Sequence, residues 1–579
     1  MNRSSRSAAI PLLGCTLTVG MLLATSATRA DSGSPPAVVE PTPAGGPIDA
    51  AGLAATVRFL SSDALEGRGP GSRGDQVARL YLSSELEALG LVPGVGTGAG
   101  AGSPSPTWEQ SFPMVGIDSQ APATWEFQAP GGRVALARRE EFIAASGVQA
   151  ATATIQDSEV VFVGYGIQAP EYGWDDFKGV DLRGKVLLML NNDPDWDDAL
   201  FAGKRRLYYG RWTYKYESAA RQGAAGAVII HTTPSAGYPF QVVQSSWSSE
   251  QFELPAGDEP RLQISGWTTE GAAEKLVALS GRKLSELVEA ARSKSFRPVP
   301  LGIRTSLTLE NQIRKVETAN VAGLLPGSDP VLRDEVVVYT AHHDHLGVAS
   351  PDKEGDTIYN GALDNATGCA QLLALARAFA ALPERPRRSI LFLFVAAEEQ
   401  GLLGSRHYST HPTFAPGKMA ANINLDSANI YGRTRDVTYV GFGKSSLDAV
   451  VTAAAAAQGR VVHGDPAPEK GSFYRSDQFH FARIGVPAIY LDPGTEFVGA
   501  GAPAAKARQE AYDATCYHQP CDELNADWVW DGMLEDTRLA LAIGTAIANA
   551  DAMPTWNPGD EFEATREAAL ADGAGNGTP

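Results

Sequence analysis

The second half of the chain alternates between apolar runs and amphipathic stretches. Four of the runs are almost continuously apolar: 336–341, 390–396, 423–425 and 488–491. Such runs are typical of strands that are buried on both faces of a mainly parallel sheet. The stretches between them, for example 369–382 and 534–548, suit helices that cover the faces of a sheet. The pattern predicts an α/β fold, a three-layer sandwich around a mainly parallel mixed sheet.

Two helices are predicted in the first hundred residues. Residues 51–60 and 75–89 show amphipathic helical periodicity, and Gly90 is placed to end the second helix. We expect both helices to pack on the sheet.

The region between these helices and the first long apolar run has a different character. Short β-like runs such as 160–163 and 186–190 dominate it. We therefore predict an inserted β-rich domain at residues 118–304. The flanking parts, 48–117 and 305–555, would then form one discontinuous domain.

The two ends of the chain differ in composition from both predicted domains. Residues 1–30 combine a basic start, an apolar run and small residues at 28–30. This arrangement predicts a signal peptide and a secreted or periplasmic protein, with a lipoprotein signal ending at Cys15 as the alternative. Residues 31–47 are rich in Pro, Ala, Gly and Ser and predict a flexible linker. Residues 556–579 are acidic and rich in Gly and Ala, which predicts a disordered tail.

Charge and hydropathy argue against two classes of partner. The chain has 48 Lys and Arg against 67 Asp and Glu, a formal net charge of −19. It therefore lacks the basic stripe that nucleic-acid binding requires. After the predicted signal peptide, no stretch approaches the roughly 20 apolar residues that span a bilayer. We expect no nucleic-acid partner and no membrane span, while the oligomeric state stays open.

Residues that commonly bind metals follow the apolar runs or stand in loops near them. They are His342 to His345, Asp364, Glu398, Glu399, Asp426 and His518. Because ligands gather at the carboxyl ends of strands in open α/β sheets, we expect these side chains to meet. Imidazole and carboxylate donors without cysteine favour a catalytic zinc site over a structural one.

Five motifs carry these donors in a fixed order. They read AHHDHLG at 341–347, GALDNATG at 361–368, EEQGLLGS at 398–405, NLD at 424–426 and YHQPCD at 517–522. They resemble the motifs AHxDxxG, GxxDNxSG, EExGLxGS, NxD and YHxxxD of the zinc peptidases that include bacterial aminopeptidases and glutamate carboxypeptidase II. The resemblance covers residues 312–550 closely and 50–117 loosely, and it implies the fold of those peptidases.

The resemblance also implies a ligand set for two Zn(II) ions per chain. Asp364 would bridge the two metals. His342 and Asp426 would complete one site, and Glu399 and His518 would complete the other.

Two further residues receive roles from the same resemblance. Glu398 would not bind a metal and would act as the general base. Asp344 would accept the imidazole N–H of His342 and fix its tautomer. His343 and His345 flank these positions and leave the register of the first motif open, although Ala341 and Asp344 align best with His342 as the ligand. Outside this motif, Thr367 and Gln478 stand where the family usually has Ser and His.

The cysteines add one structural prediction. In an oxidising compartment, Cys516 and Cys521 could form a disulfide that closes a small loop around His518. Cys369 lies in an apolar helical stretch, which favours a buried thiol.

The predicted reaction is the hydrolysis of peptide bonds. Two zinc ions could share a water molecule, lower its pKa and polarise the peptide carbonyl. Glu398 would take the proton of this water and later deliver it to the leaving amine. Sites of this kind also accept Co(II) or Mn(II). We therefore predict a secreted aminopeptidase that releases N-terminal residues from peptide substrates.

The insertion resembles a second known module. Residues 164–167, 173–177 and 184–186 look like parts of the protease-associated domain, which guides substrate access in many such peptidases. A basic and aromatic stretch at 204–215 either overhangs the cleft and contacts a substrate carboxylate or chain, or is a solvated surface.

Three other functions use the same fold. A carboxypeptidase or dipeptidase of the glutamate carboxypeptidase II type would keep the same metal residues and differ mainly in nearby cations. Glutaminyl cyclases work with one zinc, and binding proteins such as transferrin receptor lack the metal ligands. The complete ligand set favours a peptidase. The chain has neither a Gly-x-Ser-x-Gly nor a His-Glu-x-x-His motif, which disfavours serine hydrolases and zincin-like proteases.

Overall fold

The structure of the protein is a computed structural model that describes residues 46–96, 105–197, 200–247 and 250–575. The predicted signal peptide and most of the predicted linker lie outside these residues. Among the helices of the described ranges, none is long and apolar enough to cross a membrane.

A mixed sheet forms the core of the region after residue 305. Its strands, in spatial order, are β1 (Val92–Pro93), β13 (Val299–Leu325), β17 (Ser389–Val395), β14 (Val336–His342), β18 (Met419–Asn424), β21 (Ala488–Asp492), β19 (Asp436–Val440) and β20 (Val461–Gly464). The four strands from β17 to β21 run parallel, and β13 and β19 flank them antiparallel. Every residue of β14, β17 and β18 is buried, which agrees with the mostly apolar sequence of these strands. The predicted mainly parallel mixed sheet is confirmed.

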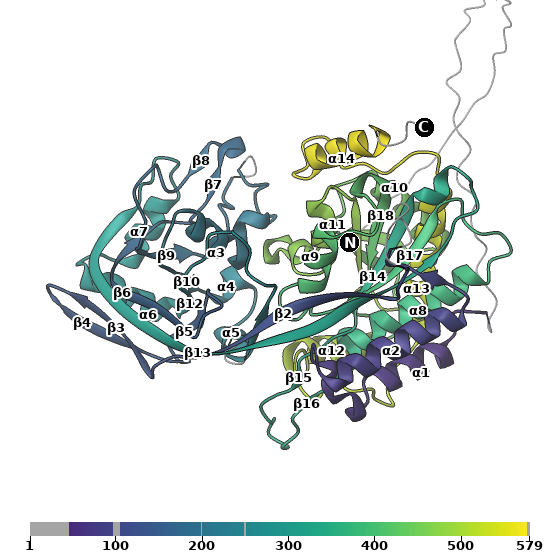
Figure 1. The fold of residues 1–579 in the computed structure, drawn as a ribbon, viewed down its shortest axis with the longest axis horizontal. Coiled ribbons are helices and arrows are strands. Elements are labelled where there is room, and N and C mark those ends of the chain that lie inside the picture. The colour runs from purple at the N-terminus through teal and green to yellow at the C-terminus, as the bar shows by residue number, and fades with distance from the viewer. Residues whose placement is uncertain (1–45, 97–104, 198–199, 248–249, 576–579) are drawn as a thin grey trace, which may run out of the picture. The chain divides into compact units, whose positions relative to one another are not determined.

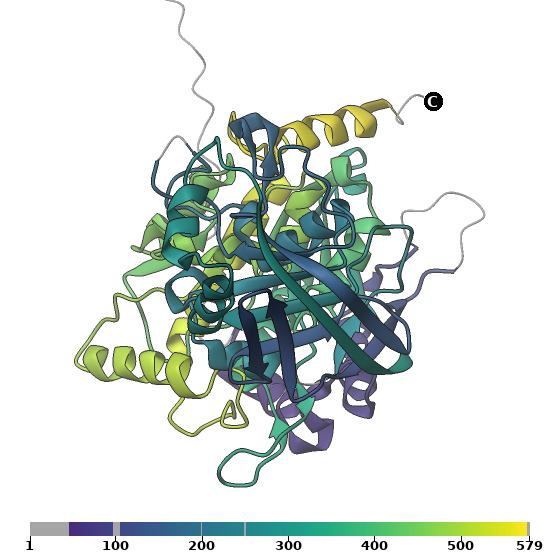
Figure 2. The same ribbon diagram turned by 90° about the vertical axis from the view of Figure 1, so that its left-hand side faces the viewer.

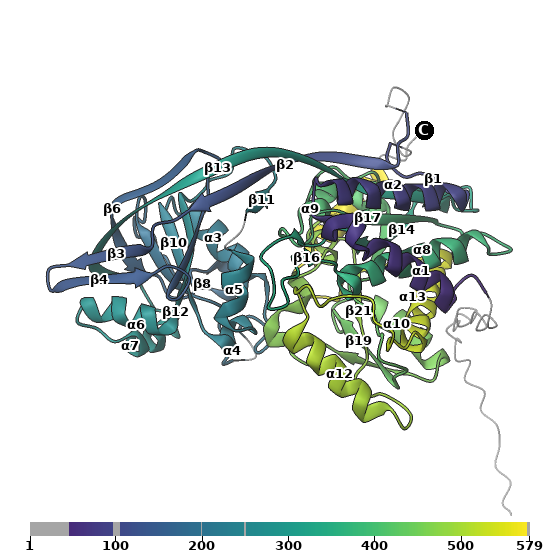
Figure 3. The ribbon, with the colours of Figure 1, turned by 90° about the horizontal axis from the view of Figure 1, so that it is seen from below.

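Helices cover both faces of this sheet (Figure 1, Figure 3). One layer contains α1 (Ala50–Leu60), α2 (Arg73–Ala88), α8 (Thr367–Ala380), α10 (Leu447–Ala457) and α13 (Asp531–Asn549). The other contains α9 (Leu403–Thr410) and α11 (Gln478–Arg483). Alternate side chains of β14 pack against opposite helix layers. Val337 packs against the first layer, and Val338 packs with Tyr408 of α9 in the second. The three-layer sandwich follows from this alternation.

The first two helices are fixed by their caps. Asp49 accepts a hydrogen bond from the backbone N–H of Gly52 at 2.9 Å, and Ser72 accepts one from Asp75 at 3.2 Å. Gly90 follows α2 with a φ of 77°, a conformation that favours glycine. Both predicted helices are therefore present, with ends shifted by one or two residues.

Two long strands run from the central sheet into the predicted insertion. β2 (Glu109–Gln120) pairs antiparallel with β13 along its whole length. The first part of β13 pairs with β6 (Thr152–Phe162) and β3 (Thr124–Ala129). The predicted boundaries at 117/118 and 304/305 thus fall inside β2 and β13. The division into a discontinuous domain and an insertion stays a prediction.

The predicted insertion has its own sheet and cores. β3 forms a hairpin with β4 (Gly132–Ala137), seen in dark blue in Figure 2. Four more strands follow β6 in spatial order: β9 (Val186–Leu190), β10 (Gly226–His231), β12 (Ile264–Thr269) and β5 (Phe142–Ser146). The helices are α3 (Trp212–Arg221), α4 (Thr233–Ala236), α5 (Phe240–Ser246), α6 (Glu270–Leu279) and α7 (Leu284–Ala291). Their apolar residues form core clusters that contain no residue of the helices covering the central sheet.

The prediction of a disordered tail at 556–579 is wrong over much of its length. Residues Glu563–Gly575 form helix α14. Arg566 of this helix is 1% exposed and donates to the carbonyl of Met419 at 3.0 Å and of Pro416 at 3.2 Å. Composition suggested disorder because one buried arginine leaves little trace in an acidic, alanine-rich segment.

Candidate metal centre

Parallel strands bring the predicted donors to one edge of the sheet. His342 is the last residue of β14 and lies in register with Val395, the last residue of β17. Asn424 ends the neighbouring strand β18 and pairs with Thr340 of β14. The segments that follow these strands therefore emerge side by side, and they carry Glu398, Glu399 and Asp426.

The first group of donors consists of His342, Asp364 and Asp426. Nε2 of His342 lies 3.1 Å from Oδ1 of Asp426 and 3.2 Å from Oδ1 of Asp364. Burial opposes a charge on His342, but the two carboxylates outweigh it and raise the pKa of this imidazole well above its usual value. The surroundings of His342 thus strongly favour a positive charge.

The second group contains His518 and Glu399 and shares Asp364 with the first. Nε2 of His518 lies 3.1 Å from Oδ2 of Asp364 and 3.1 Å from Oε2 of Glu399. Burial lowers the pKa of His518, but Glu399 and Asp364 outweigh it and raise the pKa to about 10. Burial raises the pKa of Glu399, yet His518 brings it down to about 2. Asp364 therefore directs one oxygen to each group.

The loop that carries Asp364 is held by backbone hydrogen bonds. Asp522 accepts from the N–H groups of Leu363 at 2.8 Å and Asp364 at 3.0 Å. Asn365 donates to the carbonyl of Leu425 at 2.9 Å. A Cβ on Gly368 would lie 2.3 Å from that same carbonyl oxygen, so the close approach requires glycine. These contacts explain why the acidic residue is accompanied by Asn and Gly.

Asp344 contacts the segment with the two glutamates. Its Oδ1 accepts from the backbone N–H of Glu398 at 3.0 Å, and its Oδ2 lies 3.4 Å from the backbone nitrogen of Glu399. Nδ1 of His342 lies 3.3 Å from the carbonyl oxygen of Asp344 and 3.8 Å from its carboxylate. Asp344 thus fixes the direction of His342 mainly through its backbone and aligns the glutamates through its side chain.

Glu398 stands beside the donors and belongs to neither group. Burial raises the pKa of its carboxyl well above the usual range, while the charge of His342 opposes this shift. The charges of His342 and Asp426 both act on this pKa, so the carboxyl of Glu398 lies within electrostatic reach of the first group.

The donor geometry fits a divalent metal. Two ligands of a tetrahedral zinc ion, each about 2.0–2.1 Å from the metal, lie about 3.3 Å apart. The four contacts of His342 and His518 with the carboxylates are 3.1–3.2 Å long. Oε1 of Glu399 and both ring nitrogens of His345 are buried without a regular hydrogen bond among the described residues. The mixed imidazole and carboxylate set suits zinc.

A comparison with models of protein families adds independent information. Residues 320–542 match the model of Peptidase family M28. Residues 320–542 belong to peptidase family M28. All donors of both groups, together with Glu398, stand inside this M28 segment.

Curated relatives support the same family. A "Probable zinc metalloprotease" of Pyrenophora teres f. teres is 38% identical over 118 residues, which are 20% of this chain and 24% of that protein. "Leupeptin-inactivating enzyme 1" of Streptomyces exfoliatus is 26% identical over 254 residues, which are 43% of this chain and 52% of that enzyme. The chain thus spans about half or less of the length of these relatives.

Among solved structures, the aminopeptidase from Aneurinibacillus sp. strain AM-1 is similar to the chain. The alignment covers 89% of this chain and 95% of that one, with 18% identity and a TM-score of 0.48.

Sequence reasoning left out several side chains that support the M28 segment's donors. Ser476 donates to Oδ2 of Asp426 at 2.5 Å, and Asn424 donates to Ser476 at 2.8 Å. Arg68, at the start of the chain, donates to the carbonyl oxygens of Asn360 and Gly361 at 2.6 and 2.9 Å. Ser476 stands two residues before Gln478, a position that the family resemblance had already singled out. Arg68 had no signal, because its role depends on a contact across almost three hundred residues.

A disulfide closes the loop around His518. Cys516 and Cys521 are joined, with an S–S distance of 2.16 Å, directly after helix α12 (Ala502–Thr515). His518 has a φ of 57° and its ring stacks on that of Tyr517, with ring centroids 3.9 Å apart. Cys369 is buried and free.

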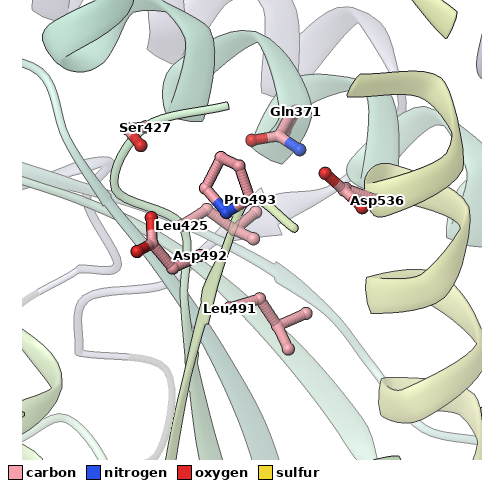
Figure 4. Close-up of a pocket in the computed structure, with 7 residues that line it drawn as sticks. All are labelled: Gln371, Leu425, Ser427, Leu491, Asp492, Pro493 and Asp536. Carbon is pink, nitrogen blue, oxygen red and sulfur yellow. The ribbon is translucent and has the colours of Figure 1, made fainter. Parts of the chain in front are cut away.

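A small pocket lies next to the strand that precedes Asp426 (Figure 4). Its lining residues are Gln371, Leu425, Ser427, Leu491, Asp492, Pro493 and Asp536. Asp536 forms an ion pair of 2.6 Å with Arg460, and burial raises the pKa of Asp492 to about 7. None of the donors lines this pocket, so it is separate from the metal centre.

The basic and aromatic stretch at 204–215 is partly buried. Lys215 is 0% exposed and its ammonium donates to the carbonyls of Tyr165 and Asn192, both at 2.6 Å. Arg206 is 3% exposed and its backbone N–H donates to Pro468 of the M28 segment at 3.1 Å. These residues are therefore not simply a solvated surface.

Proposed function

We propose that the chain is a zinc-dependent peptidase with two metal sites that share Asp364. His342 and Asp426 would complete one site, and Glu399 and His518 the other. The observation that carries this proposal is the division of Asp364, which turns one oxygen to His342 and the other to His518. The M28 match and the names of the zinc metalloprotease relatives support zinc as the metal.

The side chains around the sites support hydrolysis. Bound zinc would supply Lewis acidity for the peptide carbonyl and lower the pKa of a water molecule toward about 7. The carboxylate of Glu398 would accept a proton from the attacking water and deliver it to the amine nitrogen as the peptide C–N bond breaks. Asp344, which holds the backbone N–H of Glu398 at 3.0 Å, would keep this carboxylate in place.

We further propose an aminopeptidase that releases N-terminal residues from peptides. The sequence resemblance supports this substrate class. A carboxypeptidase or dipeptidase with the same metal residues is the second candidate. We also propose that residues 118–304 form a protease-associated domain inserted into the peptidase domain, and that the chain is secreted.

The test combines metal analysis with hydrolysis of aminoacyl-nitroanilides. Elemental mass spectrometry would be applied to the mature protein and to Glu398→Ala, after zinc loading and removal of free metal. We expect two zinc per chain in both proteins, turnover in the parent, and a fall of about 10²-fold to 10⁴-fold in kcat for Glu398→Ala.

Two outcomes would change the proposal. Two zinc per chain without aminopeptidase turnover would direct the search to carboxypeptidase and dipeptide substrates. A folded, zinc-supplied protein that retains no metal would contradict the proposed function.

A further inference from the structure

His345 is a buried imidazole that the proposed reaction does not use. Its side chain is 0% exposed, and its Nδ1 lies 2.6 Å from Oε1 of Glu399. Its ring packs edge-on against that of His518, with ring centroids 5.8 Å apart. His345 therefore lies directly behind two residues that we assign to the second metal site.

The two oxygens of Glu399 face different imidazoles. Oε2 lies 3.1 Å from His518, on the side of Asp364, and Oε1 lies 2.6 Å from His345. If Oε1 is held, the carboxylate cannot rotate about its last bond. The orientation of Oε2 would then be set before any metal binds.

Packing prevents the His345 ring from moving away. Gly361 crosses the ring so closely that a Cβ at this position would lie 2.5 Å from Cγ of His345. The backbone N–H of His345 points to the carbonyl oxygen of Arg68 at 3.4 Å. Arg68 in turn donates to the carbonyl oxygens of Asn360 and Gly361. The ring is thus enclosed by the same contacts that hold the loop of Asp364.

The distances separate a positioning role from direct metal binding. Two ligands of one tetrahedral zinc ion lie about 3.3 Å apart. The contacts of His518 with Asp364 and Glu399 are both 3.1 Å, close to this value. The contact between Nδ1 of His345 and Oε1 of Glu399 is 2.6 Å, clearly shorter than this value, although neither atom makes a hydrogen bond of regular geometry among the described residues. Donor atoms of His345, Asp364 and Glu399 lie within 4.8 Å of one another, but the 2.6 Å between His345 and Glu399 is shorter than the separation of two ligands of one tetrahedral zinc ion.

We propose that His345 is a positioning residue whose Nδ1–H holds Oε1 of Glu399 and thereby aims Oε2 at the second metal site. This inference rests on the proposed function. It extends that function by naming the group that prepares one half of the metal centre.

The experiment is a metal titration of the full-length mature chain. Metal-free protein would be titrated with Zn(II) against a chromophoric chelator, and with Co(II) while the visible absorption is recorded. The variants are His345→Ala and His345→Asn, because the amide nitrogen of Asn can take the place of Nδ1. His343→Ala is the matched control, since His343 is equally buried in the same motif but contacts Asp75 at 3.1 Å.

Removing a group that orients a metal ligand typically costs 10-fold to 100-fold in affinity. We expect His345→Ala to weaken one of the two zinc sites by this factor and to leave the other unchanged. His345→Asn should restore most of the affinity, and its Co(II) spectrum should match that of the parent. His343→Ala should keep both affinities, even if its thermal unfolding temperature falls. His345→Gln, whose N–H lies at the position of Nε2, should resemble His345→Ala and replaces it if that variant does not fold.

Other results would overturn the inference. Unchanged affinities in His345→Ala would show that Glu399 needs no such support. A Co(II) spectrum altered in both His345 variants would assign His345 as a direct ligand. If the parent itself binds no metal, the proposed function fails and the inference fails with it. If the parent binds two ions and only the His345 variants behave unexpectedly, the inference alone is wrong.

Discussion

In the metal-free chain, His518 is surrounded by carboxylates that favour its charged form. Burial opposes the charge, but Glu399 and Asp364 raise the pKa of His518 to about 10. A group whose pKa is raised by folding stabilises the folded state fully below its unfolded pKa of about 6.5. This stabilisation is lost as pH rises through the folded pKa. A divalent cation would take over the role of the proton.

This argument predicts how the stability of the metal-free protein depends on pH. Between about pH 6.5 and pH 10, the free energy of unfolding should fall with rising pH, because His518 keeps its proton in the folded state but not in the unfolded state. In His518→Gln the decline should be smaller, and saturating zinc should abolish it, because bound metal requires a neutral imidazole. Urea denaturation at a series of pH values measures the effect. An equal slope in the parent and in His518→Gln would contradict the argument.

A second prediction concerns Asp344. Its carboxylate accepts the backbone N–H of Glu398 and lies near that of Glu399. Asp344→Asn keeps the size but removes the charge and one acceptor oxygen, so Glu398 should lose its alignment. We expect kcat for aminoacyl-nitroanilides to fall about 10-fold to 100-fold. Metal content measured in the same sample distinguishes lost alignment from lost zinc, and full activity of Asp344→Asn would exclude the role.

At the scale of elements, the site is assembled from strand ends and two stabilised loops. The strand ends were predictable, because continuous apolar runs locate buried parallel strands and the residues after them must converge. The loops were only partly predictable. The motif around Asp364 contains Asn365 and Gly368, but Asp522, which accepts from the backbone N–H groups of Leu363 and Asp364, stands over 150 residues later. Ser476 and His345 contact residues that are distant in sequence, and no periodicity reveals such contacts.

The loop of His518 leads to a third prediction. The disulfide between Cys516 and Cys521 restrains a six-residue segment in which His518, the proposed zinc ligand, has a left-handed backbone conformation. Reduction by a dithiol would convert the disulfide to two thiols and oxidise the dithiol. The loop then gains conformational freedom that metal binding must remove. We expect the zinc site of His518 to weaken several-fold under reduction, with little change at the site of Asp426.

Zinc titration with and without the dithiol measures this effect. The double variant Cys516→Ser, Cys521→Ser is the control: it should resemble the reduced parent and should not respond to the dithiol. Cys369 is buried and already free, so it does not contribute to the comparison. Equal zinc affinities of the oxidised and reduced parent would show that the rest of the loop holds His518 unaided.

At the scale of the whole chain, the composition predicted two regions, but it could not show how they are connected. The change from helical to β-like patterns predicted an insertion at residues 118–304, and these residues contain core clusters of their own. Its boundaries fall inside β2 and β13, because each of these strands continues from one region into the other without a change in pattern. Side chains also cross between the regions. The guanidinium of Arg475 lies over the ring of Tyr238, 5.4 Å from its centroid.

Three arginines gather where the regions meet. Burial and the neighbouring charges of Arg475 and Arg206 lower the pKa of Arg211. The Nε atoms of Arg206 and Arg211 have no hydrogen-bond partner among the described residues. Arg475 lies within electrostatic reach of Tyr517, whose ring stacks on His518. The three guanidinium groups carry like charges, and the Nε atoms of two of them make no hydrogen bond among the described residues. Such an arrangement favours the binding of an anion close to the arginines.

We therefore predict that these arginines favour substrates that carry a carboxylate. Arg211→Ala should raise KM several-fold for a peptide with a free carboxylate and much less for an uncharged aminoacyl-nitroanilide. Arg205→Ala is the matched control, because Arg205 is exposed and adjacent to Arg206. If the contact between Arg211 and the substrate carboxylate is exposed, the difference in KM change between the two substrates should shrink at high salt, since ions screen charges on the surface. A KM that rises equally for both substrates would mean that Arg211 supports the packing of the two regions. In that case thermal unfolding of Arg211→Ala should show a matching loss of stability, which ties the interface between the regions to the shape of the site.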